Sequence, residues 1–312
     1  MSRKIIIDAD PGIDDAFAIV MAHYEKSLEV LAIHTVAGNV NLENTTRNAQ
    51  GLVKLLDMDV RVASGADSPL VYEPLFASEV HGHNGFGGVE LNEFQELSEM
   101  NAVESAVDIL TNSDEKVTIV ALGPLTNVAL LLKSYPHLKE KIECISLMGG
   151  GTKGGNTTNA GEFNFYVDPH AAHIVFNSGI PIIMAGLNVT ETAGITLKDV
   201  EELKENGGKI GKFLHDISQV SFNFSKEVLG GEEAAKINLH DVMSVLYLTK
   251  PDLFETEDYF VDIGYEEGIM RGMSLADVRP RATREPNTKV ITEIDAVAFR
   301  EYLISRIIEG EK

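Results

Sequence analysis

The chain lacks the features that mark secreted or membrane-spanning proteins. It contains a single cysteine, Cys144, which excludes an internal disulfide; its apolar setting in IECISLMGG predicts a buried strand. No apolar run is long enough to cross a bilayer. The three isoleucines at 5–7 meet Asp8 too early to form the core of a signal peptide. We therefore expect a cytoplasmic protein.

Basic residues are also scarce. Lysine and arginine number 26 against 48 aspartate and glutamate, and the net charge is −22 with no basic block. Such a surface repels DNA, RNA and anionic lipid. The expected partners are therefore small molecules, with neither nucleic acid nor a membrane among them, and the excess of acid suits a metal cation.

Short apolar runs alternate with amphipathic helical patterns along all 312 residues. Strands are expected at 4–10, 29–38, 59–65, 116–123, 142–150 and 180–186, and helices at 12–25, 42–57, 101–112, 124–134 and 168–178. Asp168 and Pro169 are typical of a helix start, and Gly179 of a helix end. The residues 200–240 are expected to be helical but the least regular part, with mobility near Gly230 and Gly231.

This alternation predicts an α/β fold. Strands that are almost continuously apolar are typical of a parallel sheet covered by helices on both faces. Without a linker or repeat, we expect one Rossmann-like domain over 1–312, with a mostly parallel central sheet and the active site at the C-terminal ends of its strands.

The first strand runs into DADPGIDD, which places four carboxylates within residues 8–15. In an extended strand Asp8 and Asp10 share one face, and Asp14 and Asp15 fall in the first turn of the next helix. Helix capping by Asp10 accounts for one or two of these acids. Each remaining pair repels by about 1 kcal/mol or more at a partly buried site, and a hard cation with oxygen ligands removes that conflict.

Two histidine-containing segments offer further ligands. His81 and His83, in HGHNGFGG, resemble a pair of zinc ligands. They lack cysteine partners and the helical spacing that places two histidines on one zinc ion. Asp241 follows His240 and precedes an apolar helical run, where it could simply cap the helix. Beside the opening acids, this pair also suits a metal ligand and a proton donor.

These motifs together resemble one family. DADPGIDDA, GPLTN, the MGGG to EFNFYVDP segment, LHD and RGMSLADVR occur in order from residue 8 to 279, as in the inosine-uridine-preferring nucleoside hydrolases. The resemblance implies a single Rossmann-like domain that binds one calcium ion and cleaves the N-glycosidic bond of ribonucleosides such as inosine and uridine. It also suggests a homodimer or homotetramer.

Site residues follow from the same resemblance, motif by motif. Calcium would be held by Asp10, Asp15, Asp241 and the backbone carbonyl of Thr126. The resemblance implies that the nucleoside contacts Asp14, Asn39, His81, Met148, Asn156, Glu162, Phe163, Asn164 and His240. Within this set, Asn156 and Glu162 match positions that hold the ribose 5′-hydroxyl.

Chemistry assigns two catalytic roles. Glycosidic cleavage develops positive charge on the sugar, which surrounding carboxylates stabilise more than the neutral ground state. The metal would fix the ribose diol and lower the pKa of a bound water, and Asp10, next to both, is the expected general base. His240 is the expected acid that protonates the departing base.

The base pocket is less well defined. The segment around 215–230 carries Phe222 and Phe224 where the resemblance leads us to expect a tyrosine, and His83 and Asn84 are not the expected neighbours of His81. The absence of tryptophan disfavours the purine-specific relatives that stack the base between indoles. His240 favours a range covering both purines and pyrimidines.

The same residues are compatible with two other functions. In a phosphatase of the haloacid-dehalogenase type, Asp8 would be the nucleophile and Asp10 the acid, but Pro11 and Gly12 follow where a threonine or valine is usual. A calcium-dependent nucleoside-binding protein without catalysis keeps every ligand. His240 argues against it, because binding alone does not need a proton donor.

Overall fold

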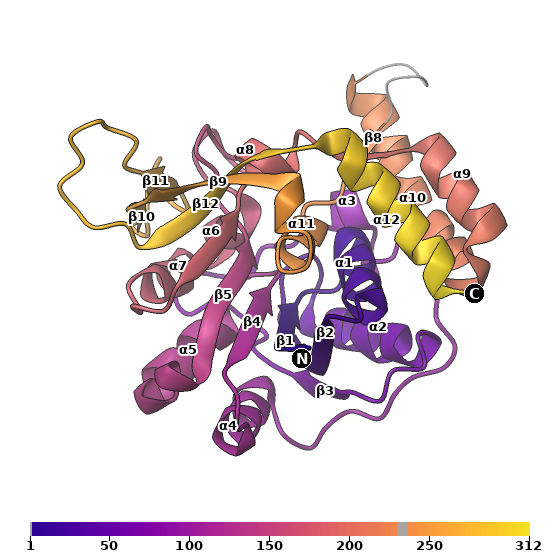
Figure 1. Ribbon diagram of the computed structural model, residues 1–312, viewed down its shortest axis with the longest axis horizontal. Helices are drawn as coiled ribbons and strands as arrows, with labels where there is room; N and C mark the ends of the chain where they lie inside the picture. The colour runs from indigo at the N-terminus through magenta and orange to yellow at the C-terminus, as the bar shows by residue number, and fades with distance from the viewer. Residues whose placement is uncertain (1, 230–235) are drawn as a thin grey trace.

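The alternating pattern folds into one eight-stranded sheet with helices on both sides (Figure 1). The computed structural model describes residues 2–229 and 236–312. In spatial order the strands are β3 (Arg61–Ser64), β2 (Leu28–Thr35), β1 (Arg3–Ala9), β4 (Val117–Ala121), β5 (Ile142–Met148), β6 (Ile182–Ala185), β12 (Thr288–Ile294) and β9 (Phe254–Tyr259). All neighbouring pairs are parallel except β12 with β9, so the predicted mostly parallel sheet is confirmed.

The isoleucines of β1 show why this strand is apolar throughout. Ile5 and Ile7 belong to one hydrophobic core and Ile6 to the other, and all three are at most 1% exposed. Alternate side chains of a strand point to opposite faces, so a strand covered on both sides needs an apolar residue at each position.

Helices complete the two cores. Figure 1 shows α4, α5 and α7 on the opposite side of the sheet from α1 and α12. The first core contains residues of α1 (Ile13–Tyr24), α2 (Leu42–Leu55), α9 (Leu197–Asn206), α10 (Gly208–Leu229), α11 (Val242–Leu246) and α12 (Ala296–Gly310). The second contains residues of α4 (Ala102–Asn112), α5 (Thr126–Ser134) and α7 (Pro169–Phe176).

Several short elements connect the main strands and helices. The helices are α3 (Ser78–His81), α6 (Phe163–Val167) and α8 (Leu187–Thr190), with 3₁₀ turns at Pro136–Lys141 and Pro251–Leu253. Two antiparallel pairs join β7 (Gly194–Thr196) to β8 (Lys236–Asn238) and β10 (Val261–Ile263) to β11 (Ser274–Ala276). None of the helices in the described ranges has both the length and the apolarity needed to span a bilayer.

Strand order positions the site. From β1 the chain builds the sheet outward through β2 and β3 and then returns to add β4 on the other side. The C-terminal ends of the three neighbours are joined, because the Val36 amide donates to Ala9 and the Leu122 amide donates to Asp8. Ligands of open α/β sheets bind at such a reversal, and DADPGIDD begins there.

Most of the predicted elements are present, with ends shifted by a few residues at most. Cys144 lies buried in β5 as expected, and Asp168 caps α7 through its side chain. The expectation for 200–240 is correct in being helical but wrong in being irregular, since α9 and α10 occupy most of it. Gly230 and Gly231 lie outside the described residues. Strands β9 and β12 were not predicted.

Candidate functional site

A cavity of about 620 Å³ opens at the C-terminal ends of β1, β4 and β5. Most of the residues proposed from sequence line it. They are Asp10, Asp14, Asn39, His81, Met148, Asn156, Glu162, Phe163, Asn164, His240 and Asp241. They come from segments spread over more than two hundred residues, so the sheet topology has gathered them.

Asp10 is fixed at the bottom of this cavity. It is 1% exposed, and its Oδ2 accepts a hydrogen bond from the backbone amide of Asn39 at 2.7 Å. Two glycines make room for it, because a Cβ on Gly38 or Gly123 would lie 2.1 or 2.4 Å from an Asp10 carboxylate oxygen. Asp10 does not cap α1, whose N-cap is Gly12, so the capping interpretation of this residue is wrong.

Three further carboxylates converge beside it. Oxygens of Asp14, Asp15 and Asp241 lie within 4.8 Å of one another. Asp15 Oδ2 accepts from the Gly12 amide and from Asn39 Nδ2, whereas no described residue donates a hydrogen bond to its buried Oδ1. A buried carboxylate oxygen without a donor is the kind of ligand that a hard cation takes.

Electrostatics supports the same assignment. Burial raises the pKa of Asp10 well above its ordinary value, and the charge of Asp15 raises it further. Burial and the neighbouring Asp14 likewise raise the pKa of Asp241, and they raise that of Asp15 to about 7. Several buried acids that repel one another are unfavourable without a counter-charge, and the cluster therefore fits a divalent cation.

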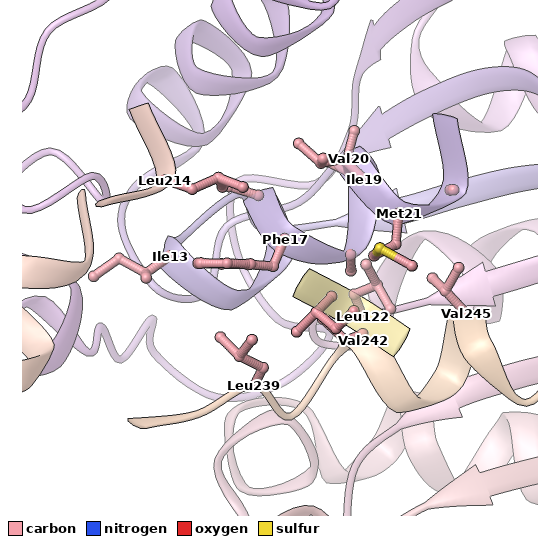
Figure 2. Close-up of a cluster of buried hydrophobic side chains, with 14 of the residues drawn as sticks. Ile13, Phe17, Ile19, Val20, Met21, Leu122, Leu214, Leu239, Val242 and Val245 are labelled. Atoms are coloured by element: carbon pink, nitrogen blue, oxygen red, sulfur yellow. The ribbon is translucent and has the colours of Figure 1, made fainter. Parts of the chain in front are cut away.

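Hydrophobic packing brings Asp241 to this cluster from far along the chain. Its neighbours Leu239 and Val242 are fully buried, and Figure 2 shows them in one cluster with Ile13 and Phe17 of α1. The helix that follows Asp241 packs against α1. Asp241 occupies the N-cap position of α11, as the capping alternative expected, but its side chain makes no capping hydrogen bond there.

Two histidines face the cavity with different partners. The backbone amide of Ile13 donates to His81 Nδ1 at 3.2 Å, which places the proton of a neutral His81 on Nε2. His240 Nδ1 lies 2.7 Å from the Thr190 hydroxyl. Burial lowers the pKa of both histidines, so both are mainly neutral near pH 7. A neutral imidazole offers the cavity an N–H donor.

The opposite end of the cavity is held by Glu162. Its carboxylate accepts from the amides of Gly150, Asn164 and Phe165 at 2.8, 3.0 and 3.3 Å, which caps α6. Burial nevertheless raises its pKa to about 7. Asn156, in the glycine-rich loop, accepts from the Phe163 amide at 2.9 Å. The two residues proposed from sequence as a pair thus lie at the start of the same short helix.

Glu162 predicts a pH dependence of stability. Its folded pKa of about 7 exceeds the ordinary 4.5, so between these values the folded protein keeps a proton that the unfolded chain has lost. This stabilisation is complete below pH 4.5 and is lost as the pH rises to about 7, by up to roughly 1.4 kcal/mol per pH unit. In urea unfolding with chelator, Glu162→Gln should gain stability relative to wild type over that range. A difference that does not change with pH would contradict the prediction.

Thr126 begins α5, shortly after the end of β4. Its side-chain hydroxyl donates to buried Asp168 at 2.7 Å, and the metal-binding role of its backbone carbonyl stays a prediction. Between β4 and α5, Leu122 lines the cavity, and its carbonyl accepts from Asn164 Nδ2 at 2.7 Å. The sequence carries no signal for such a carbonyl, because every residue has one.

Other expectations near the cavity also change. The Asp8 carboxylate faces away from it and accepts from Asn127 Nδ2, so Asp8 and Asp10 do not act side by side and the phosphatase alternative is wrong. His83 is exposed and outside the cavity, which removes the zinc pair. Phe224 lines the mouth, whereas Phe222 is buried in the core.

Sequence reasoning missed one wall of the cavity. The segment 75–80, which includes most of α3, lines it with Leu75, Phe76 and Val80, each more than a third exposed. These residues have no helical or strand periodicity that would single them out. Exposed apolar side chains beside a polar pocket are suited to cover a flat, largely apolar group.

Comparison with known sequences finds matches over nearly the whole chain. The family model described as inosine-uridine preferring nucleoside hydrolase matches residues 5–301. The chain is 41% identical over 309 residues to the pyrimidine-specific ribonucleoside hydrolase RihA of Salmonella typhi, covering 98% of this chain and 99% of the relative. It is 40% identical over 312 residues to RihA of Enterobacter sp. (strain 638), covering 99% of each.

Solved structures agree as well. A purine-preferring ribonucleoside hydrolase from Gardnerella vaginalis superposes with a TM-score of 0.92 at 30% identity. The plant nucleoside hydrolase PpNRh1 has a TM-score of 0.91 at 31% identity. Each comparison covers 99% of both chains.

Proposed function

The chain belongs to the inosine-uridine preferring nucleoside hydrolase family and is a ribonucleoside hydrolase, and we propose that it works with a calcium ion held by the acids at the bottom of the cavity. The observation that carries the proposal is the trio Asp14, Asp15 and Asp241, together with the unpaired Asp15 Oδ1. The available ligands are oxygens, which calcium prefers and zinc does not.

The proposed side-chain ligands are Asp15 and Asp241 of this trio together with Asp10, whose pKa burial and the charge of Asp15 raise. Asp14, the third member of the trio, is proposed to contact the ribose. The backbone carbonyl of Thr126, at the start of α5, is the proposed fourth protein ligand. When bound, the ion would supply Lewis acidity that lowers the pKa of water and binds the ribose diol.

The side chains around the ribose have two tasks in this proposal. Asp10 is the general base, placed by the Asn39 amide and by the space that Gly38 and Gly123 leave. Asp14, Asn39 and Asn164 contact the ribose hydroxyls, while Glu162 and Asn156 hold the 5′-hydroxyl and Met148 and Phe163 cover the sugar. The carboxylates among these side chains favour the cationic sugar of the transition state over the neutral substrate.

His240 is the proposed donor to the leaving base. With the Thr190 hydroxyl on Nδ1, the tautomer in which Thr190 donates leaves the proton on Nε2, where it can be given to the base. His81, whose Nδ1 already accepts from Ile13, is proposed as a second contact to the base.

We further propose that pyrimidine ribonucleosides are the better substrates. Relatives named pyrimidine-specific are 40–41% identical to this chain, whereas the solved hydrolase named purine-preferring is 30% identical. The measurement is kcat/KM for uridine, cytidine, inosine and adenosine. A higher value for either purine would contradict this preference.

The organisation of the protein is part of the proposal. We propose one catalytic domain over 1–312 that forms a cytoplasmic homodimer or homotetramer. Support comes from the family match, which runs over 5–301, and from the single cysteine. Light scattering of the purified protein measures the number of subunits.

Metal removal tests the proposed function. Dialysis against a calcium chelator is expected to lower the release of ribose from uridine by at least about a hundredfold, because the ion contributes several kcal/mol to the transition state. Added calcium should restore turnover in the wild type but not in Asp15→Asn, which lacks a proposed ligand. Undiminished turnover after exhaustive chelation would overturn the metal assignment. Absence of ribose release from every nucleoside would favour a binding protein.

A further inference from the structure

The segment RGMS (Arg271–Ser274) is one of the motifs in the sequence, yet none of its residues lines the cavity. Ser274 begins β11 and is 5% exposed. We propose that Ser274 is a positioning residue that holds Glu162 in place for the ribose 5′-hydroxyl, an inference that rests on the proposed role of Glu162.

Ser274 fixes the backbone of the glycine-rich loop. Its hydroxyl accepts from the Gly151 amide and donates to the Gly151 carbonyl, both at 2.8 Å. A Cβ on Gly150 would lie 2.5 Å from Ser274 Oγ, so the loop and the hydroxyl are in close contact. Gly150 has a φ of +66°, a conformation that glycine adopts without strain. The buried Ser274 hydroxyl thus fixes both the amide and the carbonyl of Gly151.

The glycine-rich loop, once fixed by Ser274, determines the position of the Glu162 carboxylate. The amide of Gly150, next to the residue that Ser274 binds, donates to Glu162 Oε2 at 2.8 Å. This is the shortest of the three amide contacts to the Glu162 carboxylate, and it is the only one of them that comes from outside α6. Ser274 therefore controls the contact that aims the carboxylate relative to the end of β5.

The other end of the same segment holds α6. Arg271 Nε donates to the Tyr166 carbonyl at 3.1 Å, and its guanidinium lies over the rings of Tyr72 and Tyr166 at 3.5 and 4.2 Å. Gly272 packs against the backbone of Tyr166. The segment thus braces the two elements that meet at Glu162, which are the glycine-rich loop and α6.

Substrate comparison separates positioning from general stabilisation. The test measures kcat/KM of wild type, Ser274→Ala and Ser274→Cys with uridine and with 5′-deoxyuridine. Ser274→Ala is expected to lose about tenfold on uridine, the effect of a disturbed contact, and no more than about twofold on 5′-deoxyuridine. Ser274→Cys puts a larger, weakly hydrogen-bonding group at the same position and should show the same pattern, to a smaller extent.

Ser105→Ala is the matched control. Ser105 is also buried and its hydroxyl also has two partners, His34 Nε2 and Arg61 Nη1, but it lies on α4 and does not line the cavity. Thermal unfolding of each variant is recorded first. Ser105→Ala is expected to lower the melting temperature while leaving the ratio of the two substrates at the wild-type value.

Glu162→Gln completes the experiment. In this background, adding Ser274→Ala should affect both substrates equally, because the contact it serves is already lost. Equal losses on both substrates in Ser274→Ala, with normal discrimination in wild type, would overturn the positioning role alone. A wild type that does not discriminate between the substrates would overturn the proposed 5′-hydroxyl contact of Glu162, and the inference with it.

Discussion

Asp10→Asn is expected to lower kcat for uridine by at least about a thousandfold, within the range of general acid–base catalysis plus a lost metal ligand. Asparagine has the same shape and keeps an oxygen that accepts from the Asn39 amide, so the cavity should stay intact. What disappears is the basic carboxylate and its negative charge. The measurement is the rate of ribose release at saturating uridine.

The same substitution is expected to stabilise the metal-free protein. Burial and the charge of Asp15 both raise the pKa of Asp10, which means that the ionised form is unfavourable in the absence of a cation. Replacing a repelled buried carboxylate by a neutral amide removes that conflict. Thermal unfolding in chelator should therefore show a higher melting temperature for Asp10→Asn than for wild type, so that activity and stability change in opposite directions.

Asp8→Asn is the matched control for Asp10→Asn. Asp8 is also a buried aspartate with a raised pKa, but its carboxylate binds Asn127 and does not line the cavity. Its substitution should leave kcat within a few-fold of wild type. The general-base assignment is wrong if Asp10→Asn keeps more than about a tenth of the wild-type kcat.

His240→Ala should divide substrates according to their leaving group. Uracil needs a proton or a hydrogen bond as it departs, and losing the donor is expected to cost about 10²–10⁴-fold in kcat. p-Nitrophenyl riboside releases a stable phenolate without protonation, so its turnover should fall only a few-fold. An equal loss on both substrates would refute the acid role of His240.

His81→Ala distinguishes the two histidines of the cavity. His81 faces the same space, but its Nδ1 is held by the Ile13 amide. If His81 only contacts the base, its loss should raise KM more than it lowers kcat and should show no dependence on the leaving group. A leaving-group dependence in His81→Ala and not in His240→Ala would transfer the acid role to His81.

The segment DADPGIDD, residues 8–15, shows how much of the structure a local sequence pattern predicts. The apolar run before it, the turn at Pro11 and Gly12, and the helix after it are all local features, and they correctly place Asp10 at a strand end and Asp14 and Asp15 in a first helical turn. Strand β9 escaped prediction because its local pattern gives no such signal. The edge strand β9 reads FETEDY, and its polar residues carry no sign of a buried strand because solvent covers much of it.

Sequence alone determined the types of side chain available and the order in which strands and helices occur, since both depend on interactions between residues close in the chain. The apolar strands, their polar ends and the excess of acid were enough to indicate a parallel sheet with oxygen ligands at one edge.

Only the tertiary structure decided which of these groups meet. It gave Asp8 a partner, Asn127, outside the cavity and placed Asp241 beside Asp15 through the packing of Leu239 and Val242 on α1. The reason is physical: strand order and the packing of distant helices arise from contacts across the whole chain, which no local pattern contains.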